Sequence, residues 1–330
     1  MKPLLSIRNL ITDFVSVDGR TRAVNDLSFD LEKGEILGIV GESGCGKSVT
    51  SFSIMGLLPR HFARISGGQI VFGGRDLLAM SESERRQMRG KDIAMIFQEP
   101  MTSLNPLMTI GDQIAEGVWI HEGLSRAQAR RRALEMLDLV RVPDAGRRLD
   151  DYPHSFSGGM RQRVMIAIAL ACRPKLLIAD EPTTALDVTI QSQILELMTD
   201  LRRETGAAIM LITHDLGVVA ECCDRVMVMY AGRKVEEATV DELFDHPAHP
   251  YTRGLMQARP TTGHDRLSEI PGRVPDMRNP PRGCLFAARC PKAQPICHQS
   301  APEANLLANG HLAACHFPEA RVATAREERA

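Results

Sequence analysis

Short apolar runs alternate along the chain with longer segments whose apolar residues recur at helical spacing. Runs of roughly four to six apolar residues, bounded by charged or turn residues, are typical of parallel strands buried on both faces of a sheet. The sequence therefore predicts buried strands at 35–40, 93–97, 176–179, 208–213 and 225–230. Strands that alternate with helices in this way predict an α/β fold.

A block of helices interrupts this pattern between Gln98 and Arg173. Apolar residues recur there every three or four positions, which predicts helices at 110–121, 125–140 and 157–172. A further helix is predicted at 46–58, directly after the first strand. Beyond residue 258 Pro, Gly, Cys and His dominate and the periodicity ends, so we expect a domain boundary at 258–260 and a small irregular domain at 259–330.

The loop between the first strand and its helix fits the pattern G-x-x-x-x-G-K-[ST], which builds phosphate sites. Glycines let backbone N–H groups turn towards phosphate oxygens, and the helix N-terminus adds a positive dipole end. A glycine-rich turn with a chance Lys-Ser is disfavoured, because all positions are in register. Lys47 is expected to reach the β- and γ-phosphates, and Ser48 to bind Mg²⁺. The expected ATP contacts are Gly41, Glu42, Ser43, Gly44, Cys45, Gly46, Lys47, Ser48 and Val49.

An apolar strand that ends in two acids supplies a second part of an ATPase site. The strand is followed directly by Asp180 and Glu181. Asp180 is expected to hold Mg²⁺, and Glu181 to orient or deprotonate the attacking water. Two solvated carboxylates that merely end a strand are the alternative, which the upstream phosphate loop disfavours.

A second anion site is predicted where the helix at 157–172 begins. Ser157 is a good N-cap, and Gly158 and Gly159 leave the first N–H groups of the helix accessible. One nucleotide does not need two such sites from one chain. A dimer accounts for both, with each ATP between the loop of one chain and the Ser-Gly-Gly of the other. An ordinary glycine-containing helix start is the alternative.

The stretch at 156–162, Phe-Ser-Gly-Gly-Met-Arg-Gln, resembles the signature of ABC-transporter ATPases, and the resemblance covers about 4–258. It implies an ATPase domain at 1–258 with a P-loop (RecA-like) core, an antiparallel β subdomain and a helical subdomain at about 99–173. Phe156 stands where Leu is usual, and Met160 where Gln is usual. Both positions vary in the peptide-importer branch, so activity is still expected.

The resemblance also implies roles for four further residues. Phe14 stands where the family has an aromatic that stacks on adenine, although a core phenylalanine explains it nearly as well. Gln98 matches the glutamine that contacts Mg²⁺ and water, and Asp187 matches an aspartate at the dimer seam. His214 matches the histidine that senses the γ-phosphate, with a structural histidine at a strand end as the alternative. The expected catalytic set is then Glu181, His214 and Gln98.

Cys45 replaces the serine that is commoner inside the phosphate loop. A thiol beside a helix N-terminus is expected to have a lowered pKa. We therefore expect maleimide to alkylate Cys45 and block hydrolysis, and bound ATP to slow the labelling.

Composition and charge narrow the class of protein. The chain has 330 residues, 44% of them hydrophobic, and Lys+Arg number 40 against 41 Asp+Glu, so the formal net charge is −1. The absence of a basic excess disfavours nucleic-acid binding. The longest apolar run, 164–172, is far below the ~20 residues that span a bilayer. We expect a chain that stays in the cytoplasm and is able to dock on a membrane protein.

Four cysteines gather in the irregular C-terminal part, which in a reducing cytoplasm favours a metal site. Their spacing lacks C-x₂-C pairs and does not choose the metal. The segments 246–255, 283–291 and 296–297, with 314–316, resemble the C-terminal domain of oligopeptide/dipeptide importer ATPases. That resemblance implies a [4Fe–4S] cluster, with structural Zn²⁺ or free thiols as alternatives. The expected ligands are Cys284, Cys290, Cys297 and Cys315.

These features predict an ATP-binding and hydrolysing subunit of a membrane importer for di- or oligopeptides or similar solutes. The implied partners are a paralogous ATPase subunit, two transmembrane permease subunits and, indirectly, an extracytoplasmic solute-binding protein. The sequence alone also permits a homodimer of the ATPase subunit. The expected place is the cytoplasmic face of the inner membrane. A soluble ABC ATPase acting on nucleic acid or ribosomes is the alternative, disfavoured by the single cassette. A P-loop kinase is disfavoured by the Ser-Gly-Gly signature and His214.

Overall fold

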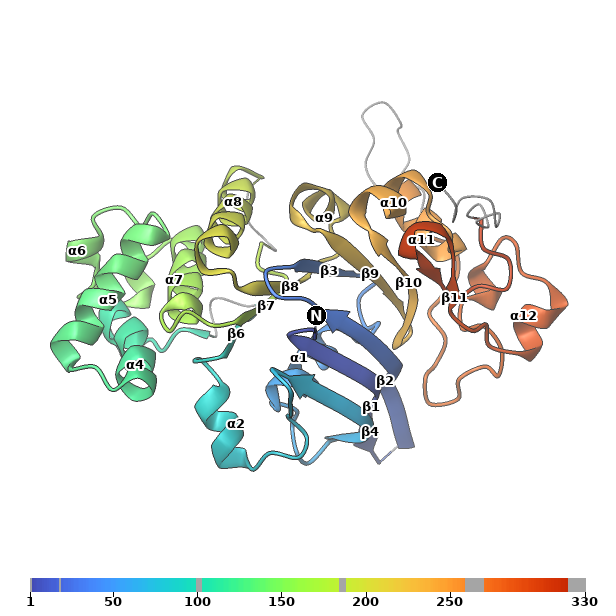
Figure 1. Ribbon diagram of the computed structural model, residues 1–330, viewed down its shortest axis with the longest axis horizontal. Coiled ribbons are helices and arrows are strands. Elements are labelled where there is room, and N and C mark those ends of the chain that lie inside the picture. The colour runs from blue at the N-terminus through green and yellow to red at the C-terminus, as the bar shows by residue number, and fades with distance from the viewer. Residues whose placement is uncertain (1, 18, 99–102, 184–187, 259–269, 320–330) are drawn as a thin grey trace. The chain divides into compact units, whose positions relative to one another are not determined.

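The computed structural model describes residues 2–17, 19–98, 103–183, 188–258 and 270–319 (Figure 1). The chain divides into two compact units, which are described separately. The first unit comprises Met1–Leu4, Leu31–Ile36 and Asp76–Ile212. The second unit comprises Leu5–Asp30, Leu37–Arg75 and Thr213–Ala330.

Three parallel strands form the sheet of the first unit. They are β6 (Ile93–Ile96), β7 (Leu176–Asp180) and β8 (Ala208–Ile212). Ile93 pairs with Leu176, and Leu176 pairs with Ala208. Every residue of these strands is buried, as expected for apolar runs in a sheet covered on both faces. The helices α2 (Glu82–Met88) and α8 (Val188–Thr205) belong to the same unit.

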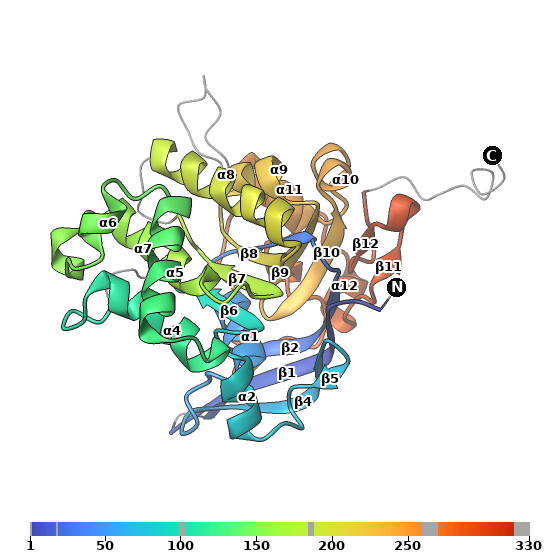
Figure 2. The same cartoon turned by 60° about the vertical axis from the view of Figure 1, so that its left-hand side comes forward.

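Helices dominate the described residues between β6 and β7, as predicted. They are α4 (Ile110–Glu122), α5 (Arg126–Leu139), α6 (Ala145–Arg148) and α7 (Gly158–Leu170), with the short turn η1 (Pro153–Ser155). The helices α4, α5 and α7 pack against one another (Figure 2). Thr109, Ser125 and Ser157 cap three of these helices through their side-chain oxygens, which explains where the helices begin. The predicted helical subdomain is confirmed.

In the second unit the phosphate loop lies between a buried strand and a helix. The strand is β3 (Ile36–Val40) and the helix is α1 (Lys47–Met55). β3 pairs in parallel with β9 (Arg225–Tyr230), and β9 pairs antiparallel with β10 (Arg233–Thr239). Three helices follow these strands: α9 (Leu216–Cys222), α10 (Val240–Asp245) and α11 (Pro250–Gln257).

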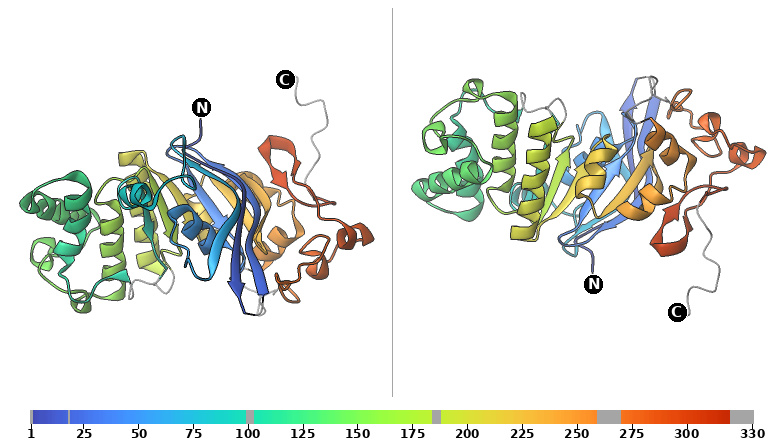
Figure 3. Two further views of the ribbon diagram at one scale, coloured as in Figure 1. Left: turned by 90° about the horizontal axis from the view of Figure 1, so that it is seen from below. Right: turned by 90° about the horizontal axis from the view of Figure 1, so that it is seen from above.

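A four-stranded sheet completes this part of the second unit (Figure 3). Its order is β2-β1-β4-β5, with β1 and β4 antiparallel. The strands are β1 (Leu5–Ser16), β2 (Gly19–Leu31), β4 (Ala63–Phe72) and β5 (Arg75–Asp76). The antiparallel β subdomain that the resemblance implied is therefore confirmed.

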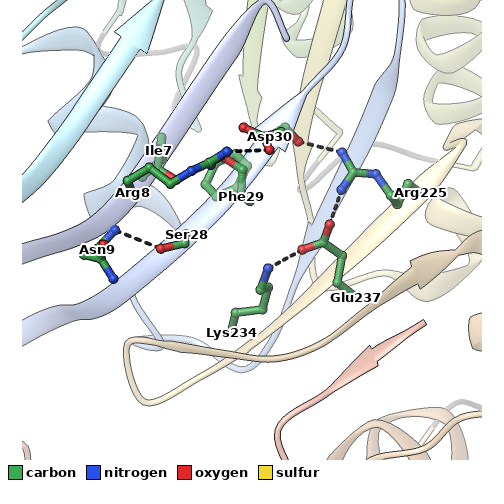
Figure 4. A network of polar contacts seen from close by, with 9 residues as sticks. All are labelled: Ile7, Arg8, Asn9, Ser28, Phe29, Asp30, Arg225, Lys234 and Glu237. Carbon is green, nitrogen blue, oxygen red and sulfur yellow. Dashed lines mark hydrogen bonds and ion pairs between the residues drawn. The ribbon is translucent and has the colours of Figure 1, made fainter. Parts of the chain in front are cut away.

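Charged side chains link β2 to the β9–β10 hairpin (Figure 4). Arg225 pairs with Glu237 and also donates to the backbone carbonyl of Asp30 at 2.6 Å. Lys234 approaches the other oxygen of Glu237 at 2.5 Å, and Arg8 pairs with the Asp30 carboxylate at 2.7 Å. Glu237 therefore serves two cations within the hairpin, and Arg225 joins the hairpin to β2, which is far away in the sequence.

The C-terminal part shares its core with β9, β10 and α11. It contains η2 (Ala287–Arg289), α12 (Pro295–Gln299), β11 (Asn305–Leu306), η3 (Ala308–Gly310) and β12 (Leu312–Ala313). β12 pairs with β10, and Phe286 belongs to the same apolar cluster as Tyr230 and Tyr251. A separate Cys-rich domain is therefore not confirmed, and residues 259 and 260 of the predicted boundary at 258–260 lie outside the described residues. Within the described part of the chain, no helix is long and apolar enough to cross a membrane.

Candidate functional site

The loop from Gly41 to Ser48 wraps around the ammonium of its own lysine. Lys47 is 5% exposed and donates to the carbonyl oxygen of Gly41 at 2.7 Å and to that of Glu42 at 3.1 Å. It opens α1, whose N-cap is Gly46 with φ 100°. The loop thus places a cation and a helix N-terminus at one point, the arrangement that suits bound phosphates.

Two glycines of the loop are required by their surroundings. A Cβ on Gly41 would lie 2.2 Å from the carbonyl oxygen of Met229, and a Cβ on Gly46 would lie 2.4 Å from that of Ala23. Both residues also have positive φ, which disfavours any side chain. The glycine pattern read from the sequence therefore reflects close packing of the loop on neighbouring strands.

The expected lowering of the Cys45 pKa is wrong. Its thiol is 2% exposed, and burial raises its pKa, although the charge of Lys47 acts in the opposite direction. The Sγ atom lies 3.8 Å from the Lys47 Nζ atom, inside the loop. The helix N-terminus lies beside Cys45 as expected. Desolvation of the thiolate nevertheless raises the pKa more than the nearby N–H groups and Lys47 lower it.

The predicted acidic strand end lies in the first unit. Asp180 is the last residue of β7 and is 2% exposed. Glu181 follows with φ 48°, and its N–H donates to the carbonyl of Ile212 at 2.9 Å. Gln98 donates from Nε2 to the Glu181 carboxylate at 3.1 Å. Gln98 and Glu181, far apart in the sequence, therefore lie within hydrogen-bond distance of each other.

The signature residues lie on the surface at the start of α7. Ser157 caps the helix, its Oγ accepting the N–H of Met160 at 3.4 Å. Ser157 and Gly158 are exposed, and a Cβ built on Gly158 would have open space around it. Phe156 is buried beside them, with the Arg148 guanidinium 5.5 Å above its ring. The unusual Phe156 therefore serves packing and leaves the Ser-Gly-Gly surface accessible.

The structure describes two of three further predicted residues. His214 is exposed and follows Thr213, whose N–H donates to the carbonyl of Ile39 at 3.2 Å, near the start of the phosphate loop. Phe14 is half-buried in β1 opposite Ala63. Asp187 lies outside the described residues.

The four C-terminal cysteines line one small cavity with Phe286 and Phe317. Burial raises the pKa of Cys284, Cys290 and Cys315, the last to about 11, and negative charge on neighbouring thiols raises these values further. Backbone N–H groups act in the opposite direction, and that of Phe317 donates to the Cys315 sulfur at 3.4 Å. Among the described residues, however, no group of three or more His, Cys, Asp or Glu side chains is arranged to hold a metal ion. The predicted metal site is not confirmed.

Sequence reasoning missed two residues that touch the phosphate loop. Tyr251 accepts the N–H of Glu42 on its hydroxyl at 2.8 Å. Arg289 forms two bonds to the Glu42 carboxylate, at 2.6 and 2.9 Å. Both lie more than two hundred positions along the chain from Glu42, and no local pattern in the sequence signals the contact.

Comparison with known proteins identifies the family of the chain. A family model described as ABC transporter matches residues 24–184, and one described as oligopeptide/dipeptide transporter, C-terminal region, matches residues 235–297. The dipeptide transport ATP-binding protein DppD of Bacillus subtilis is 51% identical over 323 residues, which cover 97% of this chain and 96% of that protein. The chain belongs to the ATP-binding proteins of di- and oligopeptide ABC importers.

Two other similarities extend this assignment. The oligopeptide transport ATP-binding protein OppD of Salmonella typhimurium is 52% identical over 318 residues, covering 96% of this chain and 94% of that protein. A solved structure described as a dimeric bacterial ABC transporter cassette is 27% identical with a TM-score of 0.65, and the match covers 72% of this chain and 98% of that one. The chain therefore has the ATPase activity of this importer family.

Proposed function

We propose that the chain binds MgATP on its phosphate loop and hydrolyses it only when a second ATPase subunit supplies its Ser-Gly-Gly signature. The observation that carries the proposal is the exposure of Ser157 and Gly158 at the start of a 13-residue helix. A helix N-terminus attracts phosphate, and this one lies on the surface, where another chain's nucleotide has access to it. The dimeric description of the similar solved cassette supports the same arrangement.

The residues in this proposal divide the work of phosphoryl transfer. Lys47 and the N–H groups of the loop bind the phosphates, and Ser48 and Asp180 hold Mg²⁺, which neutralises phosphate charge when bound. Hard oxygen donors such as a buried strand-end carboxylate and a helix hydroxyl fit that ion. Glu181 positions the attacking water and accepts its proton, while Gln98 orients the Glu181 carboxylate through the 3.1 Å bond. His214 senses the γ-phosphate of the bound ATP.

Replacing Glu181 by Gln tests this assignment. The amide cannot accept the proton of water, so we expect hydrolysis to fall ~10²-fold or more while ATP binding is retained. Steady-state phosphate release and nucleotide affinity are measured on the same preparations. Glu204→Gln, an exposed carboxylate near the end of α8, is the matched control and should behave as wild type. Wild-type turnover in Glu181→Gln would show that another group is the base.

The partners and cargo in this proposal follow from the relatives. Proteins named for dipeptide and oligopeptide transport match nearly the whole chain, so we propose that it powers import of such peptides. A paralogous ATPase subunit, two permease subunits and, indirectly, a solute-binding protein complete the assembly at the cytoplasmic face of the inner membrane. Copurification of permease chains with the tagged subunit from detergent extracts tests this. Tight binding to DNA or ribosomes instead would favour the soluble alternative.

We further propose that Cys284, Cys290, Cys297 and Cys315 hold a [4Fe–4S] cluster. The shared cavity and the N–H···S bond to Cys315 fit thiolate ligands, since such bonds stabilise negative sulfur. The cluster would supply a cross-link that orders this irregular segment. An anaerobic preparation should contain iron and acid-labile sulfide and absorb broadly in the visible range. Stoichiometric zinc in a colourless protein would assign the site to Zn²⁺ instead.

A further inference from the structure

The second residue of the phosphate loop is held by the cysteine-bearing part of the chain. Arg289 precedes Cys290 and forms two parallel bonds to the Glu42 carboxylate, from Nη1 at 2.6 Å and from Nη2 at 2.9 Å. The Arg289 side chain is 5% exposed and that of Glu42 is 29% exposed. Paired, charge-assisted bonds of this kind are directional as well as strong.

Contacts other than those to Glu42 also hold the Arg289 guanidinium in place. Its Nε donates to the carbonyl of Pro271 at 3.0 Å, its Nη2 also donates to that of Ile270 at 3.0 Å, and its Nη1 also reaches the Tyr230 hydroxyl at 3.4 Å. With the two bonds to Glu42, these contacts use all five donors of the side chain. Arg289 is therefore a rigid support for the loop, because its position is set by the C-terminal backbone.

Every polar group of Glu42 is engaged. Its carboxylate binds Arg289, its N–H donates to the Tyr251 hydroxyl at 2.8 Å, and its carbonyl accepts from Lys47 at 3.1 Å. Glu42 therefore connects the Arg289 guanidinium to the Lys47 ammonium, which is expected to bind phosphate. The positive charge of Arg289 also compensates the negative charge of the Glu42 carboxylate, which would otherwise repel the phosphates of ATP.

We propose that Arg289 is a positioning residue of the ATP site, and that through it the cysteine-bearing segment sets the affinity of the chain for ATP. The inference rests on the assignment of 41–48 as the ATP-binding loop. Phosphate loops bind by preorganised N–H groups and a placed lysine, so a change in the conformation of Glu42 weakens binding directly. Residues 270–297 are thereby part of the nucleotide site.

The test measures the affinity of the full-length chain for MgATP and its ATPase kinetics. Arg289→Lys keeps the charge but cannot form two parallel bonds, so Kd and KM are expected to rise about tenfold, with kcat kept within about twofold. Arg289→Ala, where it folds, should raise Kd about tenfold to a hundredfold. The matched control is Arg278→Ala, an exposed arginine of the same segment that pairs only locally with Asp276, and it should leave Kd unchanged.

A double-mutant cycle isolates the contact itself. In a Glu42→Gln background, Arg289→Lys should change Kd less than about twofold, because the carboxylate that accepts the two parallel bonds is already absent. Full additivity, an unchanged Kd in Arg289→Lys, or an equal loss in Arg278→Ala would each overturn the proposal. Lys47→Ala is measured beside these variants. Normal ATP binding in that variant would refute the location of the ATP site, an outcome distinct from failure of the Arg289 inference.

Discussion

Glu236 is expected to be the largest single polar contributor to the stability of the C-terminal part. Its side chain lies on β10 and is 1% exposed. Oε1 accepts the N–H of Ala248 at 2.6 Å and faces the His311 Nε2 at 2.7 Å, while Oε2 accepts the N–H of His249 at 3.0 Å and the Thr252 hydroxyl. One carboxylate therefore joins β10, the start of α11 and the chain before β12.

The substitution Glu236→Gln keeps the shape and replaces one acceptor oxygen by an amide NH₂. The His311 ring and the Thr252 hydroxyl are able to reverse roles and accept from that NH₂. The backbone N–H groups of Ala248 and His249 cannot reverse roles, so one of them is left buried without an acceptor in either amide orientation. An orphaned donor costs about 1–3 kcal/mol, and the loss of charge-assisted bonds adds to it. We expect a destabilisation of about 3 kcal/mol.

Urea unfolding at neutral pH, followed by far-ultraviolet circular dichroism, measures this change. The matched control is Glu303→Gln, an exposed carboxylate of the same segment, which should stay within about 0.5 kcal/mol of wild type. If Glu236→Gln also unfolded within that margin, the carboxylate would not be the shared acceptor, and the reasoning from its four contacts would be refuted.

Two further predictions concern the phosphate loop. Because burial raises the pKa of Cys45 above the ordinary thiol value, maleimide should label it slowly at pH 7 and faster only at pH values above 9, where thiolate begins to form. Rapid labelling at pH 7, read by mass spectrometry of the folded chain, would contradict this. Gly46→Ala should destabilise the chain more than Gly44→Ala, since both have positive φ but only the Gly46 Cβ meets a backbone oxygen; equal urea midpoints would refute the contact.

Much of the fold was predictable, because the strands that carry the site are continuous apolar runs. The run at 225–230 matches β9 at both ends, and the predicted helices at 110–121 and 125–140 agree with α4 and α5 to within two residues. Local chemistry set these limits, since Thr109 and Ser125 provide side-chain caps. Residues 41–48, Asp180 and Ser157 could be proposed from the sequence because each motif is defined within a few neighbouring positions.

The first strand shows why the antiparallel sheet could not be placed from its own pattern. Its pairing with β4 shifts between Arg8 and Ile11, and Asn9 has φ 48°. A bulge of this kind breaks the two-residue alternation that identifies a strand facing a core. The subdomain was therefore expected only from the resemblance, and its residue limits required the structure.

The loop residues show what a local motif leaves out. The sequence pattern asks for glycine at 41 and 46, but the cause lies elsewhere: the carbonyl of Met229 on β9 and that of Ala23 on β2 lie where side chains would be. The N–H of Gly232, just after β9, donates to the carbonyl of Cys45 at 2.9 Å, which fixes the same loop from a third side. This close packing also buries the Cys45 thiol, so the tight fold of the phosphate loop is the reason the pKa of its cysteine is raised.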